Sequence, residues 1–103
     1  MELMMLIVIV ERDDDMKVVE VLDDIGISSM TFVGATGTGV WQHVTRGVSP
    51  QKTLLLSVIP AEMTEPALAA LRDKAGLSEP GRGVAFTVPV SGGVGAGIDP
   101  LPG

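Results

Sequence analysis

The sequence contains no cysteine, so a whole class of stabilising and catalytic chemistry is missing. Disulfide bonds, thiolate zinc sites and cysteine nucleophiles are all excluded. Tyrosine is absent too, and histidine occurs once, at His43. A metal site would need carboxylates, or copies of His43 from several chains, and we predict none.

Basic residues are scarce. The chain has 7 Lys and Arg against 13 Asp and Glu, and its formal net charge is −6. A protein that neutralises a nucleic-acid backbone needs a surplus of positive charge. Nucleic acid is therefore not expected as a partner.

Long hydrophobic runs are lacking as well. The apolar run Leu3–Val10 has eight residues, whereas a membrane-spanning helix needs about 20. Glu2 precedes this run and Glu11 follows it, unlike the basic flank of a signal peptide. We expect neither a signal peptide nor a membrane insertion, and a cytoplasmic protein.

What the sequence does have is enough apolar material for one packed core. Its 103 residues are 46% hydrophobic, which suits a single domain. We place this domain at residues 1–90, followed by a Gly- and Pro-rich tail at 91–103. Two apolar runs, Leu3–Val10 and Gln51–Ile59, predict strands at the centre of a sheet.

Helix signals follow each of these runs. Residues 13–25 place apolar side chains at helical spacing, with Asp13 as the expected N-cap and Gly26 at the C-terminal end. Residues 64–74 show the same signals, with Thr64 as the expected N-cap. The sequence thus predicts two amphipathic helices.

The two remaining strands belong at the edges of the sheet. Residues 28–34 alternate imperfectly, and residues 84–90 contain Pro89, which cannot donate to a strand ladder. The glycine-rich segment 34–50 predicts a long loop. The resulting order is the α+β ferredoxin-like βαββαβ plait, a four-stranded antiparallel sheet with two helices on one face. The other face would be bare, so we expect a homo-oligomer.

Three sequence segments, taken in their order along the chain, resemble those of a known family. They are the helix exit Ile25-Gly26-Ile27 before Met30-Thr31, the glycine-rich segment that ends at Gly39, and the turn Pro80-Gly81-Arg82-Gly83 before the last strand. From Leu3 to about Val90 the chain resembles the PII signal-transduction proteins, that is, nitrogen regulatory protein P-II and the broader PII-like group.

The resemblance implies a homotrimer with nucleotide-binding clefts between neighbouring subunits. It also implies a T-loop between the second and third strands that changes shape with ligand and docks on a target protein, such as a transporter or an enzyme. No cofactor and no catalysis are implied, and the expected ligand is an adenine nucleotide: AMP, ADP or ATP. The ligand-binding residues implied are Thr31, Gly37, Thr38, Gly39, Gly81, Arg82 and Gly83. The candidate partner-binding residues of the loop are Trp41, His43 and Arg46.

The chain also departs from the nitrogen regulators. Arg82 is the one basic residue of the phosphate-cradling turn, so a triphosphate would be poorly neutralised. The T-loop is distinctly shorter, and without tyrosine the chain has no site for tyrosine uridylylation. The sequence is therefore better described as PII-like.

Other interpretations of the same residues stay open. Gly34–Gly39 could be a plain turn, and without a following GK[ST] it is not a P-loop. The turn at 80–83 could be a connector in which Arg82 forms an ordinary salt bridge, and Trp41 could be a local packing anchor. Two alternative functions remain: a small ferredoxin-like enzyme that uses His43, or a structural trimer resembling the CutA proteins.

Overall fold

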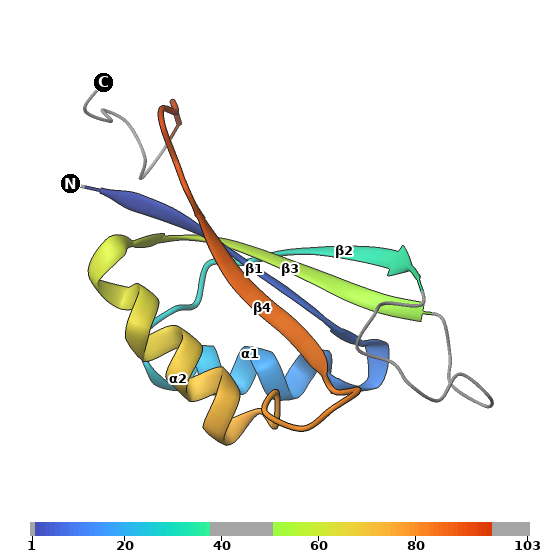
Figure 1. Cartoon of the computed structure of the whole chain (residues 1–103). Coiled ribbons are helices and arrows are strands. Elements are labelled where there is room, and N and C mark those ends of the chain that lie inside the picture. Colours follow the sequence, from blue (N-terminus) through green and yellow to red (C-terminus); the bar gives the residue numbers. More distant parts are fainter. Residues whose placement is uncertain (1, 38–50, 96–103) are drawn as a thin grey trace.

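A single twisted sheet with both helices against one side makes up the described part of the molecule (Figure 1). The structure is a computed structural model and describes residues 2–37 and 51–95. Its main elements are β1 (Leu3–Glu11), α1 (Asp15–Asp24), β2 (Thr31–Thr36), β3 (Gln51–Pro60), α2 (Thr64–Lys74) and β4 (Gly83–Pro89). Two short 3-10 turns, η1 (Arg12–Asp14) and η2 (Ala61–Met63), precede the helices.

The strand order is β2-β3-β1-β4, and every neighbouring pair is antiparallel. The two apolar runs form the central strands β1 and β3, as predicted. The imperfect strand and the strand with Pro89 form the edges. Pro89 closes β4 opposite Met4, where its missing N–H interrupts no interior ladder. The predicted ferredoxin-like plait is confirmed.

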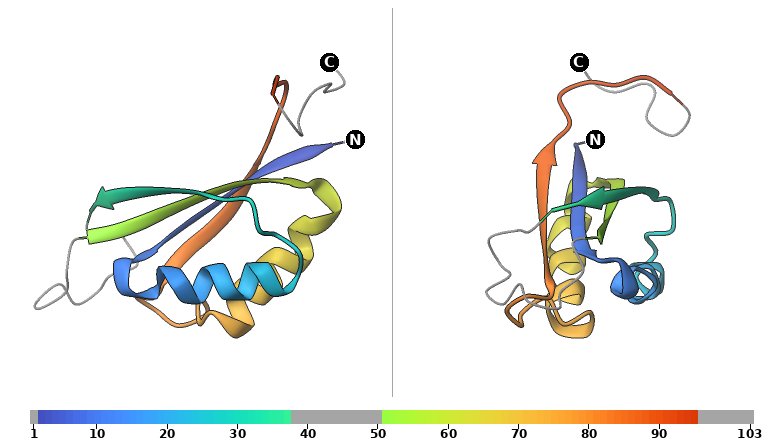
Figure 2. Two further views of the ribbon diagram at one scale, coloured as in Figure 1. Left: turned by 180° about the vertical axis from the view of Figure 1, so that it is seen from behind. Right: turned by 90° about the vertical axis from the view of Figure 1, so that its right-hand side faces the viewer.

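The core lies between the sheet and the two helices, as the rear view in Figure 2 also shows. Alternate residues of the central strands pack against one stripe of each helix. The side chains involved are almost fully buried: Leu6, Val8, Val10, Val18, Leu22, Leu55, Ile59, Ala67 and Leu71. Each large aliphatic side chain buried in this way contributes roughly 1.5–3 kcal/mol.

The opposite face of the sheet, which we call the open face, carries the other half of the strand residues. In the register, Ile7 lies between Leu56 of β3 and Phe86 of β4. The open face is apolar throughout its centre, with Met5, Ile7, Ile9, Val33, Leu54, Leu56, Val58, Val84, Phe86 and Val88. Phe86 is 42% exposed in the single chain. The prediction of a bare apolar face is therefore correct.

The helix starts differ from prediction. Asp13 is not the N-cap of α1: it lies inside η1, and Asp14 takes the N-cap position without a side-chain cap bond. Thr64 does not cap α2 but is its first residue, and its buried Oγ1 has no hydrogen-bond partner. In both cases a 3-10 turn leads into the helix, and backbone bonds such as Asp15 N to Arg12 O already satisfy N–H groups at the junction.

Two strand bounds also shift. The second strand was expected at 28–34 but spans Thr31–Thr36, because α1 ends in a Schellman-type turn in which Gly26 has φ +93° and Ile27 N bonds to Leu22 O. Residues 27–30 then connect the helix layer to the sheet, so the strand begins only after them. Gly83 joins the last strand, which ends at Pro89.

Candidate functional site

The Gly81–Gly83 turn owes its glycines to backbone geometry. Gly81 has φ +84° and Gly83 has φ +142°, both in the region that favours glycine. A Cβ on Gly83 would lie 2.6 Å from the carbonyl oxygen of Ile9. Gly83 therefore lets β4 approach β1 closely, and this requirement holds with or without a ligand.

Arg82 is the basic side chain of this turn, and its guanidinium lies beside two carboxylates of the same chain. Its Nη1 lies 3.4 Å from Oε1 of Glu79, and its Nε lies 3.8 Å from Oδ2 of Asp14. The guanidinium also covers Gly76, where an added Cβ would be 3.4 Å from the guanidinium carbon. The side chain is 40% exposed. Arg82 can offer several N–H donors to an anion, but two carboxylates already offset its charge.

Gly37 lies at the exit of β2, at the start of the predicted T-loop. Among the described residues, no atom lies within 4 Å of a Cβ built on it. Five further predicted residues lie outside the described residues: Thr38, Gly39, Trp41, His43 and Arg46.

The structure does not bring these two turns together within one chain. Gly83 pairs with Val10, Val10 with Thr53, and Thr53 with Gly34, so the turns lie at the same end of the sheet on opposite edges. Three strand spacings of about 4.8 Å separate the edges by about 14 Å. A ligand that touches both turns would need two copies of the chain.

Thr31 lies at the far end of β2. It pairs with Leu56 and is exposed on the open face. It lies six positions before Gly37, which corresponds to roughly 20 Å along a strand. In a single chain, Thr31 is therefore remote from both glycine turns.

A polar cluster that the sequence analysis missed holds the start of β3. Lys52, only 3% exposed, forms an ion pair with Glu11. Next to this ion pair, Arg12 Nη1 donates a hydrogen bond to Gln51 Oε1 over 2.6 Å. Figure 1 shows the start of β3 next to the junction between β1 and α1. The first residues of β3 are thus firmly held.

Thr53 extends this cluster, since its Oγ1 donates to Oδ2 of Asp15 over 3.0 Å. Three successive residues of β3 are thus bonded to the segment Glu11–Asp15, which also contacts Arg82 through Asp14. The available sequence signal was the polar triplet at 51–53 before an apolar strand, and the register pairs its middle residue, Lys52, with Glu11. A buried ammonium such as that of Lys52 is tolerated because a carboxylate accompanies it.

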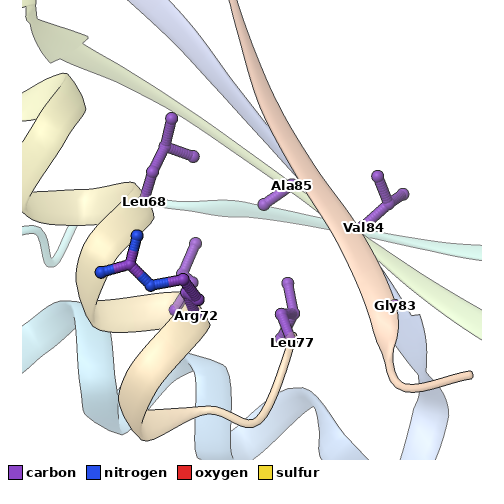
Figure 3. A pocket seen from close by; sticks show the side chains of 7 residues that line it. Leu68, Arg72, Leu77, Gly83, Val84 and Ala85 are labelled. Atoms are coloured by element: carbon purple, nitrogen blue, oxygen red, sulfur yellow. The ribbon is translucent and has the colours of Figure 1, made fainter. Parts of the chain in front are cut away.

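A shallow groove of about 310 Å³ lies between α2 and β4. Figure 3 shows Leu68 and Leu77 on one side of it and Ala85 on the other, with Arg72 on the α2 side, while the Val84 side chain points away from α2. Arg72 is hydrogen-bonded to Asp73 at 2.8 and 3.1 Å. This contact raises the pKa of Arg72 and lowers the pKa of Asp73. Among the predicted site residues that the structure describes, Gly83 alone lines the groove.

Comparison with known proteins shows which group this arrangement belongs to. Residues 3–94 match the family model described as Nitrogen regulatory protein P-II. The chain belongs to the P-II family. The resemblance inferred from the helix exit, the glycine-rich segment and the Gly81–Gly83 turn is therefore confirmed.

Solved P-II structures share the fold. One is CPII bound to ADP, AMP and acetate, from Thiomonas intermedia K12, with 22% identity, a TM-score of 0.68 and coverage of 86% of each chain. Another is Arabidopsis thaliana PII bound to citrate, with 23% identity, a TM-score of 0.69 and coverage of 87% of this chain and 78% of the other. No curated protein sequence matches the chain.

Two further features of this P-II chain concern metals and membranes. Within residues 2–37 and 51–95, no three His, Asp or Glu side chains are grouped so as to hold a metal ion. The helices of this same part of the chain are too short to cross a bilayer.

Proposed function

We propose that this protein is a PII-like sensor: a cytoplasmic homotrimer that binds an adenine nucleotide such as AMP or ADP between its subunits. The loop at 38–50 then signals to a target protein. Membership of the P-II family supports this function. Two fold relatives support the ligand class, since CPII was solved with ADP, AMP and acetate and Arabidopsis PII with citrate.

The observation that carries the proposal is the placement of the two glycine turns. They lie at the same end of the sheet but on opposite edges, about 14 Å or more apart. When copies associate around an axis, the β4 edge of one subunit comes beside the β2 edge of the next. Gly81–Gly83 and Gly37 can then contact the same ligand, and backbone N–H groups near glycines approach phosphate closely.

The open face supplies the driving force for association. Its ten apolar side chains are exposed or half-exposed in the single chain. Each Å² of apolar surface removed from water contributes about 25 cal/mol. Covering this face with other copies of the same sheet stabilises the assembly without any further element.

Signalling follows from the anchoring of the loop. The start of β3 is fixed by Lys52 and Thr53 to the β1–α1 junction, so a ligand at Gly37 acts on a loop whose other end is held. Differential binding to two loop conformations shifts their populations. A partner protein reads the difference, and no catalytic step is involved.

Thermal-shift titration of the full chain with AMP, ADP and ATP tests this function. We expect a nucleotide to raise the melting temperature, since a ligand at 100 times its Kd stabilises by about 2.7 kcal/mol. Arg82→Ala should reduce the rise. Lys17→Ala removes an equal charge from an exposed position of α1 and serves as the control. The absence of any nucleotide-dependent shift in the wild-type chain would refute nucleotide sensing.

A further inference from the structure

The contacts of Arg82 are unusually loose for an arginine that faces two carboxylates. Its distances to Glu79 and Asp14 are 3.4 and 3.8 Å, whereas charge-assisted hydrogen bonds measure about 2.7–2.9 Å. Elsewhere in the same chain, Arg72 reaches Asp73 at 2.8 Å. Arg82 is thus held by attraction of opposite charges more than by tight hydrogen bonds.

The loose pairing leaves Arg82 available to a better acceptor. Its guanidinium is partly exposed and carries five N–H donors in a fork that matches phosphate or carboxylate. Exposed ion pairs of this length contribute little to stability. An anion that binds the guanidinium therefore displaces or joins the carboxylates at small cost.

Two carboxylates lie beside the Arg82 guanidinium, so an anion bound there would face both of them. Glu79 belongs to the same turn region, and Asp14 belongs to an acidic junction that also contains Asp13 and Asp15. One positive charge thus stands among several negative ones. Each additional negative charge on a ligand gains attraction to a single arginine but adds repulsion from two or more carboxylates.

We propose that Glu79 and Asp14 determine ligand specificity by charge: they reserve Arg82 for anions of low charge, such as a phosphomonoester, and reject a triphosphate. The proposal rests on the proposed function in placing the ligand anion at Arg82. It assigns a role to two acidic residues near the turn. Both of them act by repelling the ligand anion rather than by binding it.

Binding of inorganic anions tests this specificity without the nucleoside. Full-length wild-type protein is titrated with phosphate and with tripolyphosphate at constant ionic strength, and the two affinities are expressed as a ratio. The same ratio is measured for Glu79→Gln, for Asp14→Asn and for the double variant. The wild-type chain should prefer phosphate, and the double variant should shift the ratio about tenfold toward tripolyphosphate.

A matched control separates a local effect from net charge. Asp73→Asn removes the same charge from α2, where Asp73 pairs with Arg72, and its ratio should equal that of the wild type. The amide variants keep the side-chain shapes, and a ratio measured within one variant is independent of that variant's stability. An unchanged ratio in the double variant overturns the proposal, and so does an equal shift in Asp73→Asn.

Parallel titrations with AMP and ATP distinguish this proposal from the proposed function. If the inorganic ratio shifts in the double variant but no nucleotide binds, the charge selection holds and nucleotide sensing fails. If AMP binds wild type and Arg82→Ala equally, nucleotide sensing holds and the charge selection fails. If neither inorganic anion binds any variant, the charge selection is likewise refuted.

Discussion

The two faces of this sheet are built from the same strands and differ in what covers them. Leu55 and Leu56 are neighbours on β3, yet Leu55 is 1% exposed under the helices while Leu56 lies half-buried on the open face. A stably folded domain needs only the first of these faces. The second is an apolar surface that the single chain leaves unused, and we assign it to association between copies.

Substitution of the two leucines gives the largest expected difference. Leu55→Ala should lower the free energy of unfolding by about 2–5 kcal/mol, because it leaves a cavity in a closed core. This loss should be the same at every protein concentration. Leu56→Ala should cost less than about 1 kcal/mol in the isolated chain.

Protein concentration sharpens the comparison. If copies cover the open face, the penalty of Leu56→Ala should grow with concentration in urea unfolding, because association stabilises only the folded state. Equal, concentration-independent penalties for both variants would show that the two faces do not differ in this way.

A charge at the centre of the open face should abolish assembly. Ile7 lies between Leu56 and Phe86, so Ile7→Glu would bury an unpaired carboxylate at the interface at a cost of several kcal/mol. Light scattering should then report monomers with an intact fold. Met16→Glu, at an exposed position of α1, should leave the oligomer unchanged. A surviving oligomer in Ile7→Glu would remove the open face from the interface.

The two glycine turns differ on a smaller scale. Gly83→Ala places a Cβ 2.6 Å from Ile9 O at φ +142°, and we expect a loss of about 1–3 kcal/mol. Gly37→Ala meets nothing within 4 Å, so stability should change by less than about 0.5 kcal/mol. Thermal unfolding checks both values. A larger loss at Gly37 than at Gly83 would contradict the roles given to the two turns.

The outer surface of the helices should show the smallest effect. The Arg72 hydrogen bond lowers the pKa of Asp73, so the folded state favours the carboxylate. Its contribution is present above the unfolded pKa and is lost as pH falls through the folded pKa. Asp73→Asn should therefore match the wild type at acid pH and be slightly less stable at neutral pH. A difference that grows on acidification would have the wrong sign.

Much of the fold could be predicted because its signals are local. The run Leu3–Val10 and the proline at 89 fixed the central and edge strands without knowledge of any contact. The helix caps were missed because Asp13 and Thr64 have the right chemistry for capping, while 3-10 turns satisfy the N–H groups instead. The bounds of β2 depend on how many residues climb from α1 to the sheet, which is a three-dimensional property.

The candidate site was less predictable, since its contacts join distant segments. Arg82 was noticed as a basic residue in a glycine turn, but its neighbour Asp14 is far away in sequence. The requirement for Gly83 arises from Ile9 O, and the burial of Lys52 arises from its pairing with Glu11. The sequence therefore identified the turns, and the tertiary structure supplied the charges and contacts around them.

Cysteine cross-linking tests most directly whether association brings the two turns together. The natural chain has no cysteine, so a double variant with Gly37→Cys and Pro80→Cys carries the only thiols. Within one chain these positions lie on opposite sheet edges, whereas a disulfide requires Cα atoms within about 7 Å. We predict that mild oxidation gives covalently linked dimers and trimers, which neither single variant forms to the same extent. Monomers alone after oxidation would contradict a shared ligand cleft between subunits.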